Sequence, residues 1–465
     1  MRAYKDSGIE WLGEIPEHWE VVPIRCCFNE SNIRCNESDY PLLSVTIVNG
    51  VIYQNDIANK KDISNDDKSS YKIVPLNAVA YNKMRMWQGA VGVNMLGKGI
   101  VSPAYIVAIP NKQITSIYSF YLLRAKSMIN EFEKNSYGLC LDMNNLRYED
   151  FRNIKIPLPP IEEQKAIAEF LDSKCKQIES FVDKKQKLIA LLNEKKQALI
   201  NECVTKGLDK NVNFKDSGIE HLGAIPTYWE IKRLKYIVSL QNQKSGNIDS
   251  LVASLPQNDE YLCHSNDSAS SRHSDLERSE REESHKNNNT NFRIGLENIE
   301  SKTGKYIPTS EIVFEEDGIK FENGDILFGK LRPYLAKVFL ADRGGICVSE
   351  FLVLRTKGAN NHFLKFLMLS PLFIDIVDSS TYGTKMPRAN WEFIGNLKIP
   401  LPPIEEQKQI TQFLDSEISK IDSIIGKIKK QIELIKEYKN SLINQAVCGR
   451  VEEVSHRAYS INMRE

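Results

Sequence analysis

The eleven letters KIPLPPIEEQK occur twice in this chain, at 155–165 and at 398–408, without a single difference. Both copies lead to the letters FLDS, at 170–173 and 413–416. A second repeat, the SGIE segment, precedes each copy: SGIEWLGEIPEHWE at 7–20 and SGIEHLGAIPTYWE at 217–230 share ten of fourteen residues. Self-similarity over such distances is the signature of a duplicated architecture. The sequence predicts one plan written twice: an SGIE segment, a variable block, the KIPLPPIEEQK joint and a long segment.

The long segment after each joint has the features of a helix. Consecutive prolines in PLPP end whatever precedes them, and the two glutamates of IEEQ lie near the positive end of the helix dipole. No proline or glycine occurs from Ala168 until Gly207, and only Gly426 interrupts the second segment between Thr411 and Gly449. We therefore expect two long helices.

A heptad spacing of mostly apolar residues runs along both segments. The rows are Leu171, Ile178, Lys185, Leu192, Leu199 and Ala168, Cys175, Val182, Ile189, Lys196 in the first, and Leu414, Ile421, Ile428, Ile435, Leu442 and Thr411, Ile418, Ile425, Ile432, Lys439 in the second. So narrow a stripe favours an antiparallel coiled coil between the two helices. The alternative is that each helix packs separately on a globular core.

The blocks at 21–154 and 231–397 differ much more than their borders, yet they share a skeleton. NKMRMWQGA at 82–90 parallels GKLRPYLAK at 329–337, and IVSPAYIV at 100–107 parallels ICVSEFLV at 346–353. Short apolar strands with one or two helices predict an α+β fold. The second block is longer chiefly because of residues 263–291, which are almost free of apolar side chains and are predicted to be a disordered insertion.

These patterns define the expected domains. They are a first domain at 1–155, a central helix at 156–210, a second domain at 211–398, a distal helix at 399–450 and a tail at 451–465.

Composition narrows the class of protein. The formal net charge is zero, which argues against a uniformly basic nucleic-acid coat but allows a local basic groove. Nine cysteines without a C-x-x-C pair argue against a zinc site or a disulfide framework and fit a reducing cytoplasm. The N-terminus has no apolar stretch of signal-peptide length, and no apolar run is long enough to span a bilayer.

Motifs of catalysis are missing from the sequence. GVNMLGKG at 92–99 resembles a phosphate-binding loop, but Gly99 stands where that loop needs Ser or Thr after the lysine. No G-x-G-x-x-G, H-E-x-x-H or G-x-S-x-G occurs. We expect neither a catalytic nor a metal site in this chain.

Clusters of cations beside aromatic residues occur at matching places in the two blocks and suit DNA reading. Arginine and lysine contact phosphates or guanine edges, and asparagine suits adenine. The first block supplies Lys83, Arg85, Trp87 and Gln88, followed by Asp142, Asn144, Asn145 and Arg147. The second supplies Lys330, Arg332, Tyr334 and Lys337, followed by Lys385, Arg388 and Asn390. The alternative is that these are ordinary solvated surface loops.

The repeated SGIE segment, the KIPLPPIEEQ joint with its long helix, NKMRMWQGAVG, YGLCLDMNNLRYEDF and YGTKMPRANWEF together resemble the specificity subunit of type I restriction-modification systems. The resemblance spans nearly the whole chain except 263–291 and the last dozen or so residues. It implies that each block is a target recognition domain that reads one half of a bipartite, asymmetric DNA site.

The same resemblance implies that the helices set the spacer between the half-sites and dock two methyltransferase subunits. Catalysis then lies outside this chain. The methyltransferase subunits bring S-adenosylmethionine, and restriction subunits that translocate DNA, also expected in two copies, bring ATP and Mg²⁺. Two other readings stay open: the recognition part of a single-chain restriction enzyme, and a coiled-coil scaffold without a role on DNA.

Overall fold

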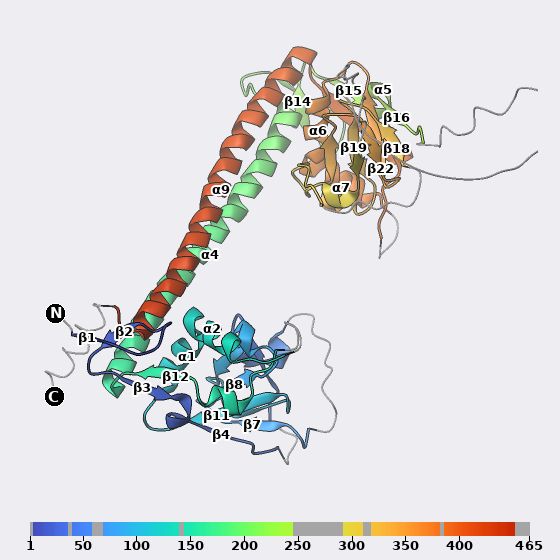
Figure 1. Ribbon diagram of the computed structural model, residues 1–465. Helices are drawn as coiled ribbons and strands as arrows, with labels where there is room; N and C mark the ends of the chain where they lie inside the picture. The colour runs from blue at the N-terminus through green and yellow to red at the C-terminus, as the bar shows by residue number, and fades with distance from the viewer. Residues whose placement is uncertain are drawn as a thin grey trace, which may run out of the picture. The chain divides into compact units, whose positions relative to one another are not determined.

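The computed structural model describes residues 3–35, 40–57, 68–138, 144–244, 292–309, 318–381 and 386–451. The predicted insertion at 263–291 and the tail after 451 lie outside these residues. The chain forms two compact units, Met1–Ile189 with Gly426–Glu465 and Ala190–Ile425. Each unit therefore contains one globular block and a part of both long helices (Figure 1). No described helix is long and apolar enough to cross a membrane.

The first block is built on a four-stranded antiparallel sheet in the order β4-β11-β8-β9. Its strands are β4 (Phe28–Glu30), β11 (Tyr105–Pro110), β8 (Val79–Asn82) and β9 (Val91–Val93). Strand pairs surround it: β1 (Tyr4–Asp6) with β2 (Glu14–Pro16), β3 (Glu20–Pro23) with β12 (Lys155–Leu158), β5 (Leu43–Thr46) with β6 (Gly50–Tyr53), and β7 (Lys72–Val74) with β10 (Gly99–Val101). The helices are α1 (Ser116–Arg124), α2 (Lys126–Lys134), α3 (Tyr148–Phe151) and the 3₁₀ turns η1 (Ile24–Cys26), η2 (Gln54–Asp56) and η3 (Met86–Gln88).

The second block repeats this order of strands, β16-β22-β19-β20. They are β16 (Val238–Gln241), β22 (Phe351–Thr356), β19 (Ile326–Gly329) and β20 (Val338–Leu340). The outer strands are β13 (Phe214–Asp216) with β14 (Ala224–Pro226), β15 (Glu230–Arg233) with β23 (Lys398–Leu401), and β17 (Arg293–Ile294), β21 (Gly345–Cys347) and β18 (Ile319–Phe321) in one sheet. The helices are α5 (Leu234–Ile237), α6 (Asn361–Leu369), α7 (Pro371–Ser379), α8 (Trp391–Asn396) and the turns η6 (Leu296–Asn298) and η7 (Pro333–Leu335). Both blocks are α+β, as the sequence predicted.

The KIPLPP half of each joint is a strand that closes its block. Ile156 in β12 pairs with Val22 in β3, and Ile399 in β23 pairs with Lys232 in β15. The strand that follows each SGIE segment, β3 or β15, is therefore hydrogen-bonded to the strand that comes just before the long helix. Those helices are α4 (Ile161–Lys206) and α9 (Ile404–Val447), and α9 continues unbroken through Gly426.

The IEEQ half makes the same contacts in both copies of the joint. The indole of Trp19 donates to the Glu163 carboxylate at 2.7 Å, and that of Trp229 donates to Glu406 at 3.0 Å. Each tryptophan is completely buried, so its N–H needs a partner. The glutamates therefore attach each helix to the SGIE segment of its own block.

The glutamine of IEEQ attaches the helix to the rest of the block. Gln164 accepts from the Thr115 N–H at 2.8 Å, and Gln407 accepts from the Asn360 N–H at 2.8 Å. Thr115 and Asn360 are the N-caps of α1 and α6. Each glutamine amide also donates to a carbonyl of the PLPP prolines. Because both glutamines are buried, replacing either would leave several backbone groups unpaired.

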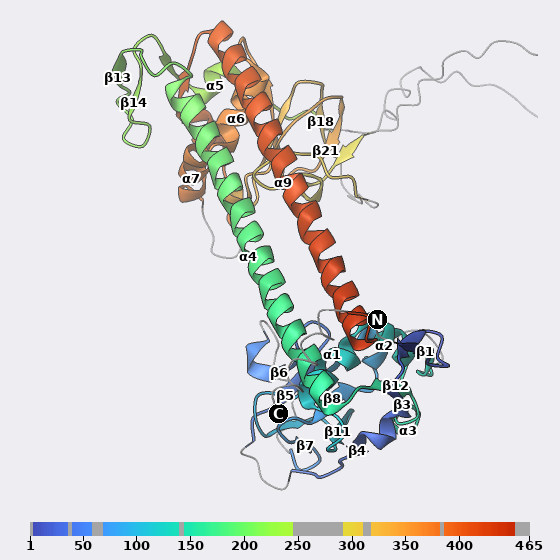
Figure 2. The ribbon, with the colours of Figure 1, turned by 90° about the vertical axis from the view of Figure 1, so that its left-hand side faces the viewer.

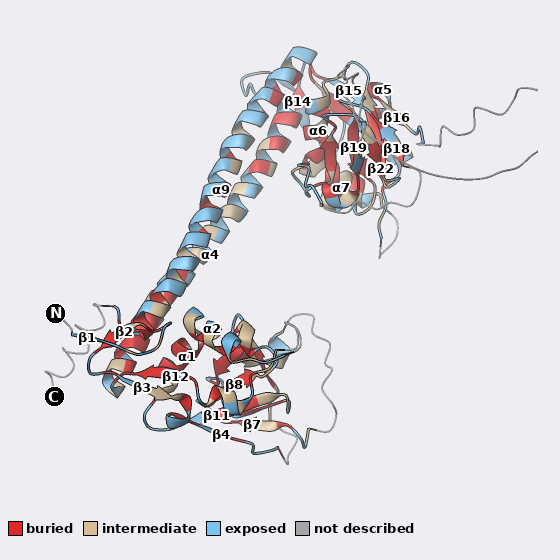
Figure 3. Ribbon diagram, in the orientation of Figure 1, coloured by how far each residue is buried: buried red, intermediate tan, exposed pale blue. Residues whose placement is uncertain are grey.

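Each block is also packed against the end of the other block's helix. Leu442, Ala446 and Val447 of α9 belong to the core that contains Trp19, while Ile200, Cys203 and Val204 of α4 belong to the core that contains Trp229. Figure 3 shows buried positions near the ends of α4 and α9, where the helices meet the blocks.

Both helices end at a glycine in the left-handed region, Gly449 (φ 73°) and Gly207 (φ 76°). A Cβ would lie 3.0 Å from the ring of Trp19 in the first case and 3.2 Å from that of Trp229 in the second. Glycine is thus required both by its backbone angle and by the close approach of the tryptophan.

Helices α4 and α9 pack side by side in opposite directions (Figures 1 and 2), as the heptad rows predicted. All residues of the predicted seam rows are buried or half-buried. Three seam positions are lysines, Lys185, Lys196 and Lys439, and the last two have a carboxylate partner on the facing helix. Lys196 contacts Asp422 at 2.9 Å, and Lys439 contacts Glu179 at 2.8 Å.

These two ion pairs are copies of one another, because the 243-residue offset between the joints carries Lys196 onto Lys439 and Glu179 onto Asp422. Their surroundings differ. The Lys196 side chain is 6% exposed and shares Asp422 with Lys305 of the second block. The Glu179 side chain is 62% exposed. A buried polar pair at a seam fixes the register of two helices.

We predict that Asp422→Ala destabilises the second unit by about 3 kcal/mol, because it leaves the buried Lys196 amine without a carboxylate. Glu179→Ala is the matched control and should cost no more than about 1 kcal/mol, since its pair faces solvent. Thermal unfolding of the purified variants measures both. Equal losses would show that burial does not distinguish the pairs.

The effect of Asp422 should also depend on pH. Burial raises the pKa of its carboxyl, but hydrogen bonds from Lys305 and Lys196 outweigh burial and hold that pKa below its usual value. A carboxyl with a lowered pKa stabilises the fold above its unfolded pKa of about 3.9 and loses this contribution as the pH falls. The difference between wild type and Asp422→Ala should shrink below about pH 4. A constant difference would contradict this account.

Candidate nucleic-acid interface

The first cluster of each block follows the same strand of the sheet. Lys83 and Arg85 come directly after β8 and lead into η3, which contains Trp87 and Gln88. In the second block, Lys330 and Arg332 follow β19 and lead into η7, which contains Tyr334. The sequence echo between 82–90 and 329–337 therefore marks structurally equivalent loops. We call these the β8 loop (83–88) and the β19 loop (330–337).

A second loop joins each first loop through backbone hydrogen bonds. The N–H of Leu146 donates to the carbonyl of Lys83 at 2.8 Å, which brings Asn144, Asn145 and Arg147 beside the β8 loop. The N–H of Ala389 donates to the carbonyl of Lys330 at 2.9 Å. These bonds unite residues that are about sixty positions apart in the sequence into one surface on each block.

In the second block the same arrangement brings Arg388 and Asn390 beside the β19 loop, where the N–H of Arg332 also donates to the carbonyl of Pro387 at 2.8 Å. Lys385 and Asp142, which the sequence analysis also named, lie outside the described residues.

Side chains in these loops differ in how freely they can meet a ligand. Arg85, Arg147, Arg332, Tyr334 and Arg388 are exposed, whereas Lys83, Trp87, Gln88, Asn144 and Asn145 are half-buried. Exposed guanidinium groups can reach phosphates or base edges. The Trp87 indole donates to the Met84 carbonyl at 3.1 Å, which fixes its ring within the β8 loop.

Three of the predicted contact residues are engaged within the second block. Arg388 forms a two-bond ion pair with Glu350, at 2.8 and 3.2 Å, and this carboxylate raises the pKa of Arg388. The Lys337 amine donates to the Leu296 carbonyl at 2.6 Å, and burial lowers its pKa. Asn390 caps α8 by accepting from the N–H of Glu392 at 3.0 Å. Each would have to exchange or share its present partner to contact DNA.

The β19 loop holds two residues other than glycine in the left-handed region, Arg332 (φ 50°) and Ala336 (φ 47°). Outside the loop, Lys302 is also in the left-handed region (φ 64°), and its N–H donates to the carbonyls of Leu335 and Ala336 at 3.2 Å each. The equivalent of Ala336 in the first block is Gly89, at φ 93°. Each residue other than glycine in this region lowers the stability of the fold by about 1–2 kcal/mol. Strain of this kind concentrates at functional sites, and here it presents the Arg332 side chain to solvent.

Two further cations of the first block lie close to Lys83 and were missed in the sequence. The backbones of Arg34 and Lys72 face each other in an isolated antiparallel β-bridge. Burial lowers the pKa of Lys72, and the charges of Lys83 and Arg34 lower it further, against the opposing effect of Glu30. The three cations therefore interact at one place. Because they come from three separate segments, no sequence spacing connects them.

Among the described residues, no group of three or more His, Cys, Asp or Glu side chains is placed to hold a metal ion. The loops described above offer cations, amides and aromatic rings, which together can contact phosphates and base edges.

Known proteins resemble this chain over most of its length. The model of the type I restriction modification DNA specificity domain matches residues 19–190 and 279–434. The specificity subunit of the type I restriction enzyme MjaVIII from Methanocaldococcus jannaschii is 26% identical over 474 residues, which cover 97% of each chain. The specificity subunit of EcoDI from Escherichia coli is 25% identical over 343 residues, covering 73% of this chain and 70% of that one.

Solved structures share the fold. A chain from a study of complex assembly and conformational transition of the type I R-M system has a TM-score of 0.62 at 15% identity, with 94% of this chain and 99% of that chain covered. The HsdS subunit from Thermoanaerobacter tengcongensis has a TM-score of 0.51 at 16% identity, with 94% and 98% covered. With more than half of its length matched by the family model, the chain belongs to the type I restriction-modification DNA specificity subunits, which are the non-catalytic subunits of these enzymes.

Proposed function

We propose that each block reads one half of a bipartite, asymmetric DNA target through its pair of loops. The observation that carries this proposal is that the β8 and β19 loops occupy the same place on two sheets of the same strand order but differ in sequence. Because the joints are identical, loops of different sequence stand at equivalent places on the two sheets. Each block can therefore recognise its own bases. The long helices, joined to both blocks, set the length of the unread spacer.

Two arginines are the best candidates for direct contact, Arg85 and Arg332, which are exposed at matching positions. We predict that Arg85→Ala and Arg332→Ala each weaken specific binding. Loss of a paired contact to a base costs about 1–3 kcal/mol, whereas loss of a phosphate contact lowers the salt slope by about one. Measuring Kd against salt concentration distinguishes these roles. No change in either quantity would place the residue outside the interface.

The backbone of Arg332 supplies a control that separates binding from folding. Because φ is positive there, Arg332→Gly should be more stable than Arg332→Ala by about 1 kcal/mol, while both lose the same DNA affinity. Arg85 has φ −129°, so its glycine variant should gain nothing over its alanine variant. Thermal unfolding and binding measured on the four variants test both parts. If affinity followed stability instead, the arginines would act through the fold.

The blocks should read independently. We predict that exchanging residues 231–397 for the matching block of a related subunit changes one half of the methylated motif and leaves the other half intact. The contact between Trp229 and Glu406 lies outside the exchanged residues and is kept in such a chimera, whereas the incoming block must supply the N–H that Asn360 donates to Gln407. Sequencing of methylated sites in cells that carry the chimera reads the result. A change in both halves would contradict modular reading.

The helices also carry a repeated surface that fits two copies of one partner. Phe181 and Leu434 in the first unit correspond by the 243-residue offset to Ile424 and Leu191 in the second. All four are exposed, by 39% to 61%. Phe181 and Ile424 precede a seam residue by one position, and Leu191 and Leu434 follow one by two. These positions lie on the same side of each helix.

The globular blocks attach on the other side of the seam. Asp172, which accepts from the Tyr121 hydroxyl, and Asp422, which pairs with Lys305, each follow a seam residue by one position. The exposed apolar residues are thus turned away from the block that each unit carries. Exposed apolar patches of this kind mark protein–protein contacts. We assign them to two methyltransferase subunits, one on each unit.

We predict that Phe181→Lys and Ile424→Lys each remove one methyltransferase subunit from the complex, and that the double variant removes both. Ala190→Lys and Glu433→Lys, which are exposed on the opposite side of the helices, are the controls and should leave assembly unchanged. Mass measurement of the purified complexes gives the stoichiometry. Full assembly of the double variant would show that the partners dock elsewhere.

On this proposal the partners supply the chemistry: S-adenosylmethionine on the methyltransferase subunits, and ATP with Mg²⁺ on two restriction subunits. The complex would act on cellular DNA in the cytoplasm.

A further inference from the structure

A cavity of about 850 Å³ lies in the second block, away from the β19 loop. Asp325 comes directly before β19 and Lys330 directly after it, and Arg355 near the end of β22 pairs with Asp325. Arg355 lines the cavity. The cavity and the β19 loop therefore lie at opposite ends of the same strands. All of its lining residues belong to the second unit.

Aromatic rings form one wall of the cavity. The ring of Phe292 lies 5.4 Å from that of Tyr306 and 6.3 Å from that of Phe321, between centroids. Gly345 allows this approach, since a Cβ there would lie 2.3 Å from the Phe292 carbonyl oxygen and 2.7 Å from the Phe321 ring. Such a wall suits a flat ring system, because aromatic side chains stack on nucleobases whatever their sequence.

Cations lie beside the aromatic wall. The Arg343 guanidinium stands 4.8 Å over the Phe292 ring and is also paired with its neighbour Asp342 at 3.0 Å. Lys320 is exposed at the rim, and its amine has no ion-pair partner in the part of the chain that the structure describes. A cation without a carboxylate beside an aromatic wall is suited to a phosphate group.

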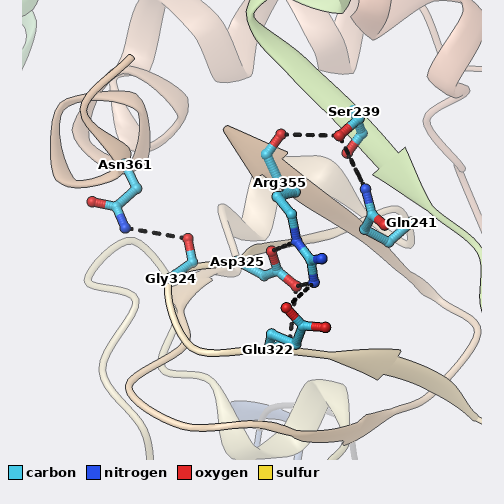
Figure 4. A network of polar contacts seen from close by, with 7 residues as sticks. All are labelled: Ser239, Gln241, Glu322, Gly324, Asp325, Arg355 and Asn361. Atoms are coloured by element: carbon cyan, nitrogen blue, oxygen red, sulfur yellow. Dashed lines mark hydrogen bonds and ion pairs between the residues drawn. The ribbon is translucent and has the colours of Figure 1, made fainter. Parts of the chain in front are cut away.

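Three further charged groups at the cavity, Arg355, Asp325 and Glu322, are paired with one another (Figure 4). Arg355 binds the carboxylate of Asp325 with two bonds, at 2.8 and 2.9 Å, and also contacts Glu322 at 2.9 Å. Asp325 is 1% exposed and accepts from the Glu322 N–H at 2.8 Å as well. These carboxylates raise the pKa of Arg355. Arg355 is therefore a fixed part of the wall, whereas the partner of Arg343, Asp342, is exposed and can be exchanged for a phosphate group.

Amide groups complete the lining. Gln241 donates to the Ser239 hydroxyl at 3.0 Å and to the Ser239 carbonyl at 3.3 Å (Figure 4), which leaves the amide oxygen as an acceptor. Gln243 lines the cavity beside it. The Gln241 amide oxygen is suited to accept a hydrogen bond from the exocyclic amine of adenine.

We propose that this cavity binds a nucleotide, with the base against Phe292 and Tyr306 and the phosphate on Lys320 and Arg343. The proposal goes beyond reading of the duplex by the β19 loop, because a base can enter the cavity only when it is not stacked in a helix. The same chemistry is offered by a free mononucleotide and by an unstacked nucleotide of a single strand.

The test uses the full chain and AMP as probe, with adenosine and ribose 5-phosphate as its two halves. AMP should bind more tightly than either half in calorimetry. The double variant Lys320→Ala/Arg343→Ala should raise the Kd for AMP by about tenfold or more and leave that for adenosine within about twofold, because two charge-assisted contacts to phosphate are lost. Lys98→Ala is the matched control, since Lys98 of the first block stacks over Tyr40 at 4.3 Å, and it should change neither value.

A second variant tests the cavity without removing charge. A Cβ at Gly344 would make only ordinary contacts, the nearest at 3.4 Å, so Gly344→Leu should fold, as its unfolding temperature will show. Because Gly344 lines the cavity, the larger side chain should weaken AMP binding by taking up part of the space. A short single-stranded oligonucleotide measured in parallel distinguishes a strand from a free nucleotide as the ligand. If the oligonucleotide binds and the same variants weaken its binding, the cavity binds a nucleotide of a single strand. If only AMP binds, the cavity binds a free nucleotide. Absence of binding by both probes, or equal binding by wild type and both cavity variants, would overturn the proposal.

Discussion

The contacts of Glu163 and Gln164, repeated at Glu406 and Gln407, hold each long helix to its block. Each glutamate accepts the N–H of a completely buried tryptophan, and each glutamine accepts the N–H of the residue that caps a second helix. A buried amide or indole that loses its partner costs more than the bond itself contributes. The glutamate and glutamine of each joint therefore tolerate little change, even though the blocks that they hold diverge in sequence. The glycines that end the helices against the same tryptophans extend this constraint to the far end of each helix.

The parts of the fold that could be predicted from the sequence are those whose sequence pattern occurs in both halves of the chain. The heptad rows indicated two long antiparallel helices, and they placed Lys196 and Lys439 at the seam before any partner was known. The echo of Lys-x-Arg-x-aromatic indicated equivalent loops. Both patterns depend on local periodicity, which a sequence displays directly.

What depends on tertiary contact was not predictable. The partner of Lys196 is 226 residues away, and Arg34, Lys72 and Lys83 meet from three separate segments. The left-handed backbone at Arg332 stands where the first block has an ordinary one, and no residue type at 332 signals it. Nor did the sequence indicate that Arg388 is paired with Glu350 or that Lys337 is tied to a carbonyl. The individual roles of the predicted contact residues therefore stay predictions.

If each block reads its own half-site, as proposed, the methylated DNA must show two separate half-sites. The most direct test is to sequence the methylated sites in cells that carry this chain with its methyltransferase partner. The account predicts a split motif, with two unlike halves separated by a spacer of fixed length and unspecified sequence. A continuous motif, or two halves that are inverted copies of each other, would contradict the claim that two different readers stand on one repeated frame.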